Sequence, residues 1–189
     1  MIWDFQTKLE ASRQGMTAAP LIQAWLVGCV RVDQAGVADD KNGIDYWATL
    51  RNGARVGIDH KLREKGAARY WRWGVPELAM EVWSVKPTPG RPGKTGWTLD
   101  ESKNTDYVLY SFHDEDSDSA YLLPFQLLRL AFRLHCADWL KEYHAKDQDS
   151  GGWKSQAIFV PAPVVLTAVQ DQMELHVTAG AISRCIESY

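Results

Sequence analysis

Residues 43–61 read GIDYWATLRNGARVGIDHK. Apolar and polar residues alternate at period two on both sides of Arg-Asn-Gly, and this pattern predicts a β-hairpin. The register of a hairpin decides which side chains share a face, because a shift of one residue turns every side chain to the other face. The register therefore decides whether Asp45, Asp59 and Lys61 come together.

Two registers are compatible with the turn residues. If the loop consists of residues 52–53, Asp45 and Asp59 point to opposite faces of the sheet. If the loop consists of residues 51–53, Asp45 lies directly opposite Asp59, and Gly53 supplies the left-handed conformation that such a loop needs at its end. Only the second register gathers the apolar residues of the hairpin on one face, namely Ile44, Tyr46, Ala48, Leu50, Ala54, Val56 and Ile58. We therefore expect the three-residue loop.

The expected pair of carboxylates has a specific chemical consequence. Opposed side chains of Asp45 and Asp59 have Cβ atoms roughly 5 Å apart, and two carboxylates that close need a cation between them. Lys61, on the same face, is able to neutralise one of them. Paired carboxylates are also what Mg²⁺ prefers, and Glu81 on the following strand is a candidate for a further ligand. The alternative is a salt bridge on an exposed sheet face.

The rest of the chain predicts a single α/β (α+β) domain over residues 1–189, with a mixed sheet flanked by helices. Helices are expected over 4–13, 21–26, 125–143 and 164–173, and strands over 28–32, 78–85, 105–112 and 157–161. Residues 86–96 hold three prolines and three glycines, which indicate a mobile loop. The tail over 177–189 is weakly patterned.

Composition limits the class of protein. The chain has 189 residues, of which 46% are hydrophobic, and a net charge of −3, as expected of one globular domain. No apolar run approaches the roughly 20 residues of a membrane span. The N-terminal stretch has no signal-peptide pattern, and the three cysteines form no CxxC pair, so a reducing cytoplasm is expected. The sequence leaves open whether the chain forms a homodimer.

A cationic and aromatic patch follows the second strand of the hairpin. Cations that contact phosphates, interleaved with rings that stack on bases, are typical of a nucleic-acid groove. The candidates for such contacts are Arg63, Lys65, Arg69, Trp71, Arg72 and, in the later loop, Lys94. The alternative is a solvated turn with tryptophans that pack in the core.

The series GIDYW, VGIDHKLRE, LAMEVWSV and GWTLDESKNTDYVLY resembles the PD-(D/E)XK nuclease superfamily, in particular its small members from phages and mobile elements. The resemblance covers residues 21–163 and implies a restriction-endonuclease-like mixed central β-sheet flanked by helices. It implies that Asp45 is the first metal-binding aspartate, that Asp59 takes the Asp/Glu position, and that Lys61 is the catalytic lysine. Glu81 is implied as an extra metal ligand.

The chain departs from the family pattern in two ways. Ile44 stands where the motif has its nominal proline, and the first-helix Glu or Gln of some relatives has only Glu10 and Gln23 as candidates. The number of metal ions therefore stays open. Lys103 and Asp106 also match the pattern, without an assigned role.

These residues predict a Mg²⁺-dependent nuclease that acts on DNA, with Mn²⁺ as a substitute metal. The alternative is a non-catalytic accessory or counter-defence protein of phages or mobile elements, which uses the same fold to bind nucleic acid or a protein. The intact Asp, Asp, Lys set favours the enzyme, and the acidic net charge favours the binder. The histidines show no zinc-ligand spacing, and His60 is expected to face the core.

Overall fold

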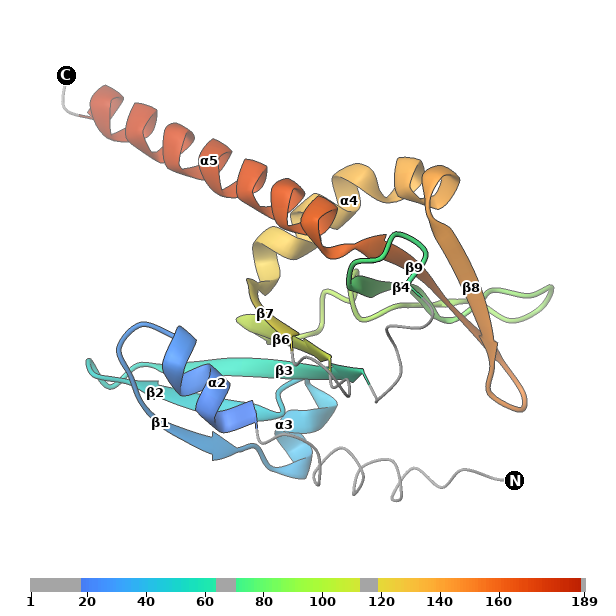
Figure 1. The fold of residues 1–189 in the computed structure, drawn as a ribbon, viewed down its shortest axis with the longest axis horizontal. Coiled ribbons are helices and arrows are strands. Elements are labelled where there is room, and N and C mark those ends of the chain that lie inside the picture. The colour runs from blue at the N-terminus through green and yellow to red at the C-terminus, as the bar shows by residue number, and fades with distance from the viewer. Residues whose placement is uncertain (1–17, 64–70, 113–118, 188–189) are drawn as a thin grey trace. The chain divides into compact units, whose positions relative to one another are not determined.

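The computed structural model describes residues 18–63, 71–112 and 119–187, with side chains up to residue 176. The chain divides into two compact units: Met1–Tyr70 with Asn104–Leu123, and Trp71–Lys103 with Pro124–Tyr189. We call them unit 1 and unit 2 (Figure 1). The described residues form a mixed α+β structure, which confirms the predicted fold class. That residues 1–189 act as one domain stays a prediction.

Unit 1 is built on a five-stranded mixed sheet in the order β1-β2-β3-β6-β7. The hairpin strand β3 pairs antiparallel with β2 and parallel with β6, so it lies in the middle of the sheet. The strands are β1 Cys29–Gln34, β2 Tyr46–Leu50, β3 Arg55–Arg63, β6 Tyr107–Phe112 and β7 Ser119–Pro124; the helices are α2 Ala18–Trp25 and α3 Val37–Lys41.

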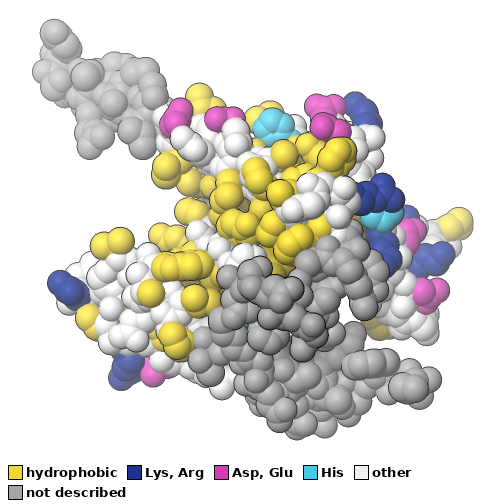
Figure 2. Space-filling model, in the orientation of Figure 1, with side chains coloured by type: hydrophobic (Ala, Val, Ile, Leu, Met, Phe, Trp, Pro, Cys, Tyr) yellow, Lys and Arg dark blue, Asp and Glu magenta, His cyan; other side chains and the backbone are white. Residues whose placement is uncertain are grey.

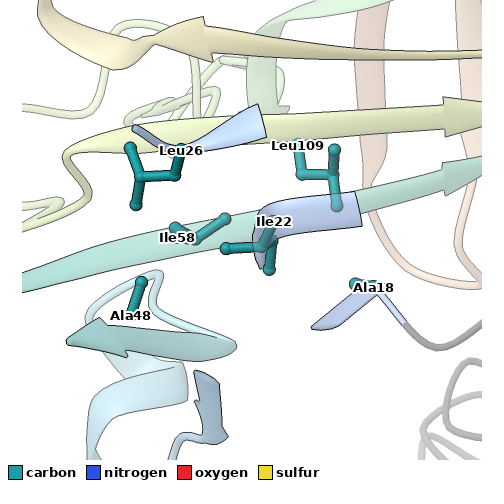
Figure 3. Close-up of a cluster of buried hydrophobic side chains, with 6 residues drawn as sticks. All are labelled: Ala18, Ile22, Leu26, Ala48, Ile58 and Leu109. Carbon is teal, nitrogen blue, oxygen red and sulfur yellow. The ribbon is translucent and has the colours of Figure 1, made fainter. Parts of the chain in front are cut away.

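Helix α2 covers one face of this sheet (Figure 3). Ala18 and Ile22 of the helix, together with Leu26 just after its end, pack against a strand surface formed by Ala48, Ile58 and Leu109. Burial of a side chain as large as isoleucine contributes roughly 1.5–3 kcal/mol, and this contribution holds the hairpin to the helix. The predicted apolar face of the hairpin is confirmed for Tyr46, Ala48, Leu50, Val56 and Ile58.

Unit 2 is built on a second sheet, in the order β5-β4-β9-β8, whose pairings are all antiparallel. Its strands are β4 Glu77–Val85, β5 Lys94–Thr95, β8 His144–Asp149 and β9 Lys154–Pro161; its helices are α4 Phe125–Glu142 and α5 Ala162–Glu187. The predicted single mixed sheet is therefore two sheets. The strand that carries Glu81 pairs with β9 and β5, whereas β3 pairs with β6.

Further elements differ from the sequence prediction, among them β8, α3 and α5. Strand β8 is exposed along most of its length and has no apolar alternation, so only its backbone pairing with β9 makes it a strand. Helix α3 is a five-residue helix just before the hairpin, where the sequence analysis expects no helix. Helix α5 continues to Glu187, through the tail that the weak pattern left unassigned. The expected helix over 4–13 lies outside the described residues.

Unit 2 exposes large apolar side chains on its two helices. They are Leu134, Leu140, Leu166, Met173 and Leu175, and Figure 2 shows hydrophobic side chains gathered over α4 and the first part of α5. No helix in the described part of the chain is both long and apolar enough to cross a membrane.

Candidate functional site

The hairpin has the three-residue loop that its apolar face predicts. Tyr46 pairs with Ile58, and the same register continues to the end of the strands, where the Leu50 backbone N donates to the Ala54 carbonyl O at 2.9 Å. Gly53 closes the loop at φ +82°, the left-handed conformation that favours glycine. The predicted register is confirmed.

This register brings Asp45 and Asp59 together, one pair beyond Tyr46 and Ile58. The Asp45 backbone N donates to the Ile58 carbonyl O at 2.8 Å, and Asp45 Oδ2 accepts a hydrogen bond from the His60 backbone N at 2.7 Å. Asp59 is buried, with 3% of its surface exposed. Two carboxyl groups therefore meet at the middle of the sheet, on the face opposite α2.

Lys61 completes the arrangement on the same face of β3. Its Nζ lies 2.7 Å from Asp59 Oδ1, and 31% of the Lys61 side chain is exposed, against 5% of the Asp59 side chain. A charge-assisted hydrogen bond of this length between a buried carboxylate and a partly exposed ammonium is strong. Lys61 therefore supplies the positive charge that Asp59 needs in its buried position.

Among the residues that the structure describes, no lysine or arginine forms a salt bridge with Asp45. Burial, followed by repulsion from the Asp59 charge, raises the pKa of Asp45 to about 6. A hydrogen bond between the two carboxyl side chains acts in the same direction, whereas the His60 backbone N–H and Lys61 lower the pKa. The pair therefore retains a proton in weak acid when no other cation is bound.

His60 faces the other side of the sheet, as expected for a core residue. Its ring Nε2 lies 2.6 Å from Ser111 Oγ on β6, and its ring meets that of Tyr46 edge to face, with 6.0 Å between the centroids. Burial lowers the pKa of His60 to about 4, so the ring is neutral at pH 7. The ring links two strands, and the backbone N–H of the same residue holds Asp45.

Ile44 differs from the sequence prediction, which placed it on the apolar face of the hairpin with Tyr46 and Ala48. It is buried, and an added Cβ at Gly57 would lie 2.9 Å from Ile44 Cδ1. Gly57 shares its face with Asp59, so Ile44 packs on the carboxylate side of the sheet. The reason is that Ile44 precedes the first residue of β2, where the alternation of a strand does not yet apply.

Glu81 belongs to unit 2, where its carboxylate holds a turn. Its Oε2 accepts from the Trp97 backbone N at 2.9 Å and from Ser84 Oγ at 2.8 Å. The turn approaches closely, because an added Cβ at Gly96 would lie 2.2 Å from the Glu81 carbonyl O. These contacts give Glu81 a structural role in unit 2, and its predicted role as a metal ligand stays a prediction.

Arg63 is the candidate for nucleic-acid contact that lies nearest in sequence to the carboxylate pair. It follows Asp59 and Lys61 on the same face of β3, and its Nε donates to the Tyr110 hydroxyl at 2.8 Å. The structure therefore fixes part of this guanidinium against β6. Lys65 and Arg69, the next two candidates, lie outside the described residues.

The remaining candidates for nucleic-acid contact belong to unit 2. Arg72 is exposed, and its backbone N donates to the buried carboxylate of Glu77 at 2.8 Å. Trp71 is half-buried, and the exposed Lys94 begins β5 in the loop that the prolines predict. Their roles as nucleic-acid contacts stay predictions.

Of the three predicted metal ligands, the structure brings Asp45 and Asp59 together. Among the residues that the structure describes, no three His, Cys, Asp or Glu side chains form a group that would hold a metal ion. The carboxylates of Asp45 and Asp59 form a pair. Gln23 is exposed on α2, on the other side of the sheet, and Glu10 lies outside the described residues.

Asp106 is the residue of this site whose role the sequence did not reveal. Its Oδ2 accepts from the Gly57 backbone N at 2.7 Å, two residues before Asp59 on the same strand. The match of Asp106 to the family pattern is the only feature of the sequence that singles this residue out. Its hydrogen-bond partner is a backbone group 49 residues away. No sequence spacing identifies such a contact.

The comparisons with known proteins add no relative. No protein-family model, curated protein or solved structure matches the chain. The resemblance to the PD-(D/E)XK superfamily therefore stays a prediction from the residues.

Proposed function

We propose that the protein is a Mg²⁺-dependent phosphodiesterase that cuts DNA. The observation that supports this proposal is the register of the hairpin, which sets Asp45 opposite Asp59 and leaves Lys61 at 2.7 Å from Asp59. A surface salt bridge needs one carboxylate and one ammonium. A second, half-buried carboxylate beside them costs stability, and a divalent cation bound to the pair would offset that cost.

The carboxylate pair fits a divalent cation by charge and by donor type. Oxygen ligands on one or two carboxylates, with the rest of the shell left to water and phosphate, are what Mg²⁺ takes in phosphodiester chemistry. Asp45 and Asp59 would hold the ion, and Mn²⁺ would substitute for Mg²⁺. When bound, such an ion polarises the phosphate and lowers the pKa of a water molecule.

Lys61 is the proposed catalytic lysine. Its side chain is partly exposed, so its ammonium is able to reach a substrate while Asp59 holds its direction. As a cation it orients the attacking water by donating a hydrogen bond, and it stabilises the negative charge that develops on the phosphate. Asp45 keeps its own direction through the hydrogen bond from the His60 backbone N–H.

DNA is the proposed substrate because cations and an aromatic ring, that of Trp71, follow the carboxylate strand in sequence. Arg63 shares the face of Asp59 and Lys61, and Arg72, Trp71 and Lys94 are the proposed contacts from unit 2. Contacts of this kind to phosphates make affinity depend on salt. The proposed place of action is the cytoplasm, where phage or mobile-element DNA is met.

A non-catalytic binding protein is the second candidate, and one observation favours it. Lys61 already balances the charge of Asp59, and the described residues add no third carboxylate to the pair. A protein with this site would bind nucleic acid or a partner without cutting. Cleavage and metal affinity distinguish the two candidates.

The decisive experiment compares wild type with Asp59→Asn and Lys61→Met. We expect wild type to cut plasmid DNA with Mg²⁺ or Mn²⁺ and not with EDTA, and each substitution to reduce the rate by about 100-fold or more. Asp33→Asn is the matched control, because Asp33 is a carboxylate of the same sheet paired with Arg31 in an exposed salt bridge. A wild type that binds DNA but neither cuts it nor binds Mn²⁺ in calorimetry would establish the binding protein instead.

A further inference from the structure

Residues 104–106 return to unit 1 just before β6, and two of them are bonded to the segment that leads into Asp45. The Asn104 backbone N donates to the Asn42 carbonyl O at 3.1 Å. The Thr105 hydroxyl donates a hydrogen bond to the Gly43 carbonyl O. Thr105 is buried, with 2% of its surface exposed. This segment therefore holds the chain two residues before Asp45.

The third residue of the segment is bonded to β3. The Asp106 backbone N donates to the Gly57 carbonyl O at 2.9 Å, and Asp106 Oδ2 accepts from the Gly57 backbone N at 2.7 Å. Both backbone groups of Gly57 are thus taken by one residue. Gly57 lies two residues before Asp59, as Gly43 lies two residues before Asp45. The segment over 104–106 is therefore hydrogen-bonded to the chain two residues before each of the two aspartates.

The side chain of Ile44 fills the space between these attachments. An added Cβ at Gly57 would lie 2.9 Å from Ile44 Cδ1 and 3.5 Å from the Asn104 carbonyl O. The absence of a side chain at Gly57 is therefore what allows Ile44 to pack here, with 3% of its surface exposed. The neighbouring Asp45 is held between this packing and the backbone of β3.

We propose that Thr105 and Asp106 are positioning residues, which hold Asp45 and Asp59 in the arrangement in which both carboxylates would bind a divalent cation. Neither side chain is offered as a metal ligand or a catalytic group; both act through the backbone of Gly43 and Gly57. This inference rests on the proposed function for the metal, and on the hydrogen bonds alone for the geometry. It also gives Asp106 a role that its match to the family pattern left open.

The test uses paired substitutions that remove or keep one hydrogen bond. Thr105→Val removes the hydroxyl at nearly constant shape, and Thr105→Ser keeps it. Asp106→Ala removes the acceptor for the Gly57 N–H, and Asp106→Asn keeps an acceptor oxygen. Thr98→Val is the matched control, because Thr98 is a fully buried threonine of unit 2 whose hydroxyl has no hydrogen-bond partner in the structure.

Two measurements follow each variant. The first is Mn²⁺ affinity by calorimetry, which we expect to fall by about 10- to 100-fold in Thr105→Val and Asp106→Ala, the range for residues that orient metal ligands. The second is the amide signal of His60 by NMR, because this N–H donates to Asp45 Oδ2 and reports the place of Asp45 without any metal. We expect its shift and its exchange protection to change with the same two variants. Thr105→Ser, Asp106→Asn and Thr98→Val should resemble wild type in both.

The outcomes separate this inference from the proposed function. Unchanged Mn²⁺ affinity and an unchanged His60 amide in Thr105→Val and Asp106→Ala would overturn the positioning role. Failure of Thr105→Ser and Asp106→Asn to restore the wild-type signals would also overturn it, since the effect would then come from packing. If wild type binds no Mn²⁺ while the His60 amide responds as expected, the metal function fails and the positioning of Asp45 stands. If Thr105→Val does not fold, Asp106→Ala tests the same attachment from the side of Asp59.

Discussion

The His60 backbone N–H donates a hydrogen bond to the Asp45 carboxylate. The pKa values of the two side chains are shifted in opposite directions. Burial and the Asp59 charge raise the pKa of Asp45 from 3.8 to about 6, and burial lowers the pKa of His60 from 6.5 to about 4. Each shift disfavours the charged form of its group in the folded protein. The two groups therefore link stability to pH with opposite signs over nearly the same range of pH.

We predict that the pH-dependent contributions of Asp45 and His60 to stability largely offset each other in metal-free wild type. In Asp45→Asn only the contribution of His60 should remain. The Asp45 contribution is present below about pH 4 and is lost as pH rises through about 6, because the folded protein holds the proton longer than the unfolded chain. The His60 contribution is present above about pH 6.5 and is lost as pH falls through about 4. In Asp45→Asn the free energy of unfolding should then fall by about 2–3 kcal/mol from pH 7 to pH 4.

Urea denaturation in EDTA at pH 4, 5, 6 and 7 measures this difference. Asp33→Asn is the control for the loss of a carboxylate from the same sheet, and it should keep the wild-type profile. If Asp45→Asn follows the wild-type curve throughout, the pKa of Asp45 is not raised by its surroundings.

The hairpin is the element on which the site depends, and one glycine closes its loop. Gly53 has φ +82°, and an added Cβ there would meet no atom within 4 Å. We predict that Gly53→Ala destabilises the protein by about 1–2 kcal/mol through backbone strain alone, and that Gly53→Asn costs less, since asparagine tolerates this conformation. Mn²⁺ affinity should stay within about twofold of wild type, because the apolar face also holds the register.

Gly152→Ala is the matched control for that prediction. Gly152 lies in the turn between β8 and β9, has the same open space for a Cβ and does not have a positive φ. Denaturant midpoints of the three variants decide the point. Equal losses for Gly53→Ala and Gly152→Ala would mean that conformation at Gly53 is not what matters.

At the scale of elements, the sequence predicts what local patterns encode. The alternation around residues 51–53 is sufficient to predict the register, and hence the meeting of Asp45 and Asp59. Strand β8 is not predicted, because its polar residues show no apolar alternation. Its pairing with β9 depends on backbone hydrogen bonds. The contact of the Thr105 hydroxyl is not predicted either, because its acceptor is a carbonyl 62 residues away.

The arrangement of whole sheets is a further step that patterns do not reach. The sequence of an apolar strand such as β4 does not indicate which strand it pairs with. For this reason a single sheet is expected from the sequence, whereas the structure has two. The chain passes between unit 1 and unit 2 at residues 70–71, 103–104 and 123–124, so neither unit is a continuous segment. The consequence for function is that Glu81 and the Asp45–Asp59 pair belong to different units.

We predict that a divalent cation protects unit 1 alone. The Glu81 carboxylate accepts hydrogen bonds from Trp97 and Ser84, and these contacts give it a structural role in unit 2 that does not involve a metal. Saturating Mn²⁺ should slow amide hydrogen exchange in β2, β3 and residues 104–108, because binding to the folded state stabilises the strands that supply the ligands. Exchange in β4 and residues 95–98 should not change.

The variant Glu81→Gln sharpens this measurement. It keeps an acceptor oxygen for the Trp97 N–H and removes the charge, so unit 2 should stay folded and Mn²⁺ affinity should match wild type within about twofold. Asp59→Asn is the positive control, in which the protection of β2 and β3 by Mn²⁺ should disappear. If instead Mn²⁺ protects β4 and residues 95–98 in wild type and Glu81→Gln abolishes that protection, then Glu81 is a metal ligand. That is the role that the resemblance to the nuclease superfamily implies for Glu81.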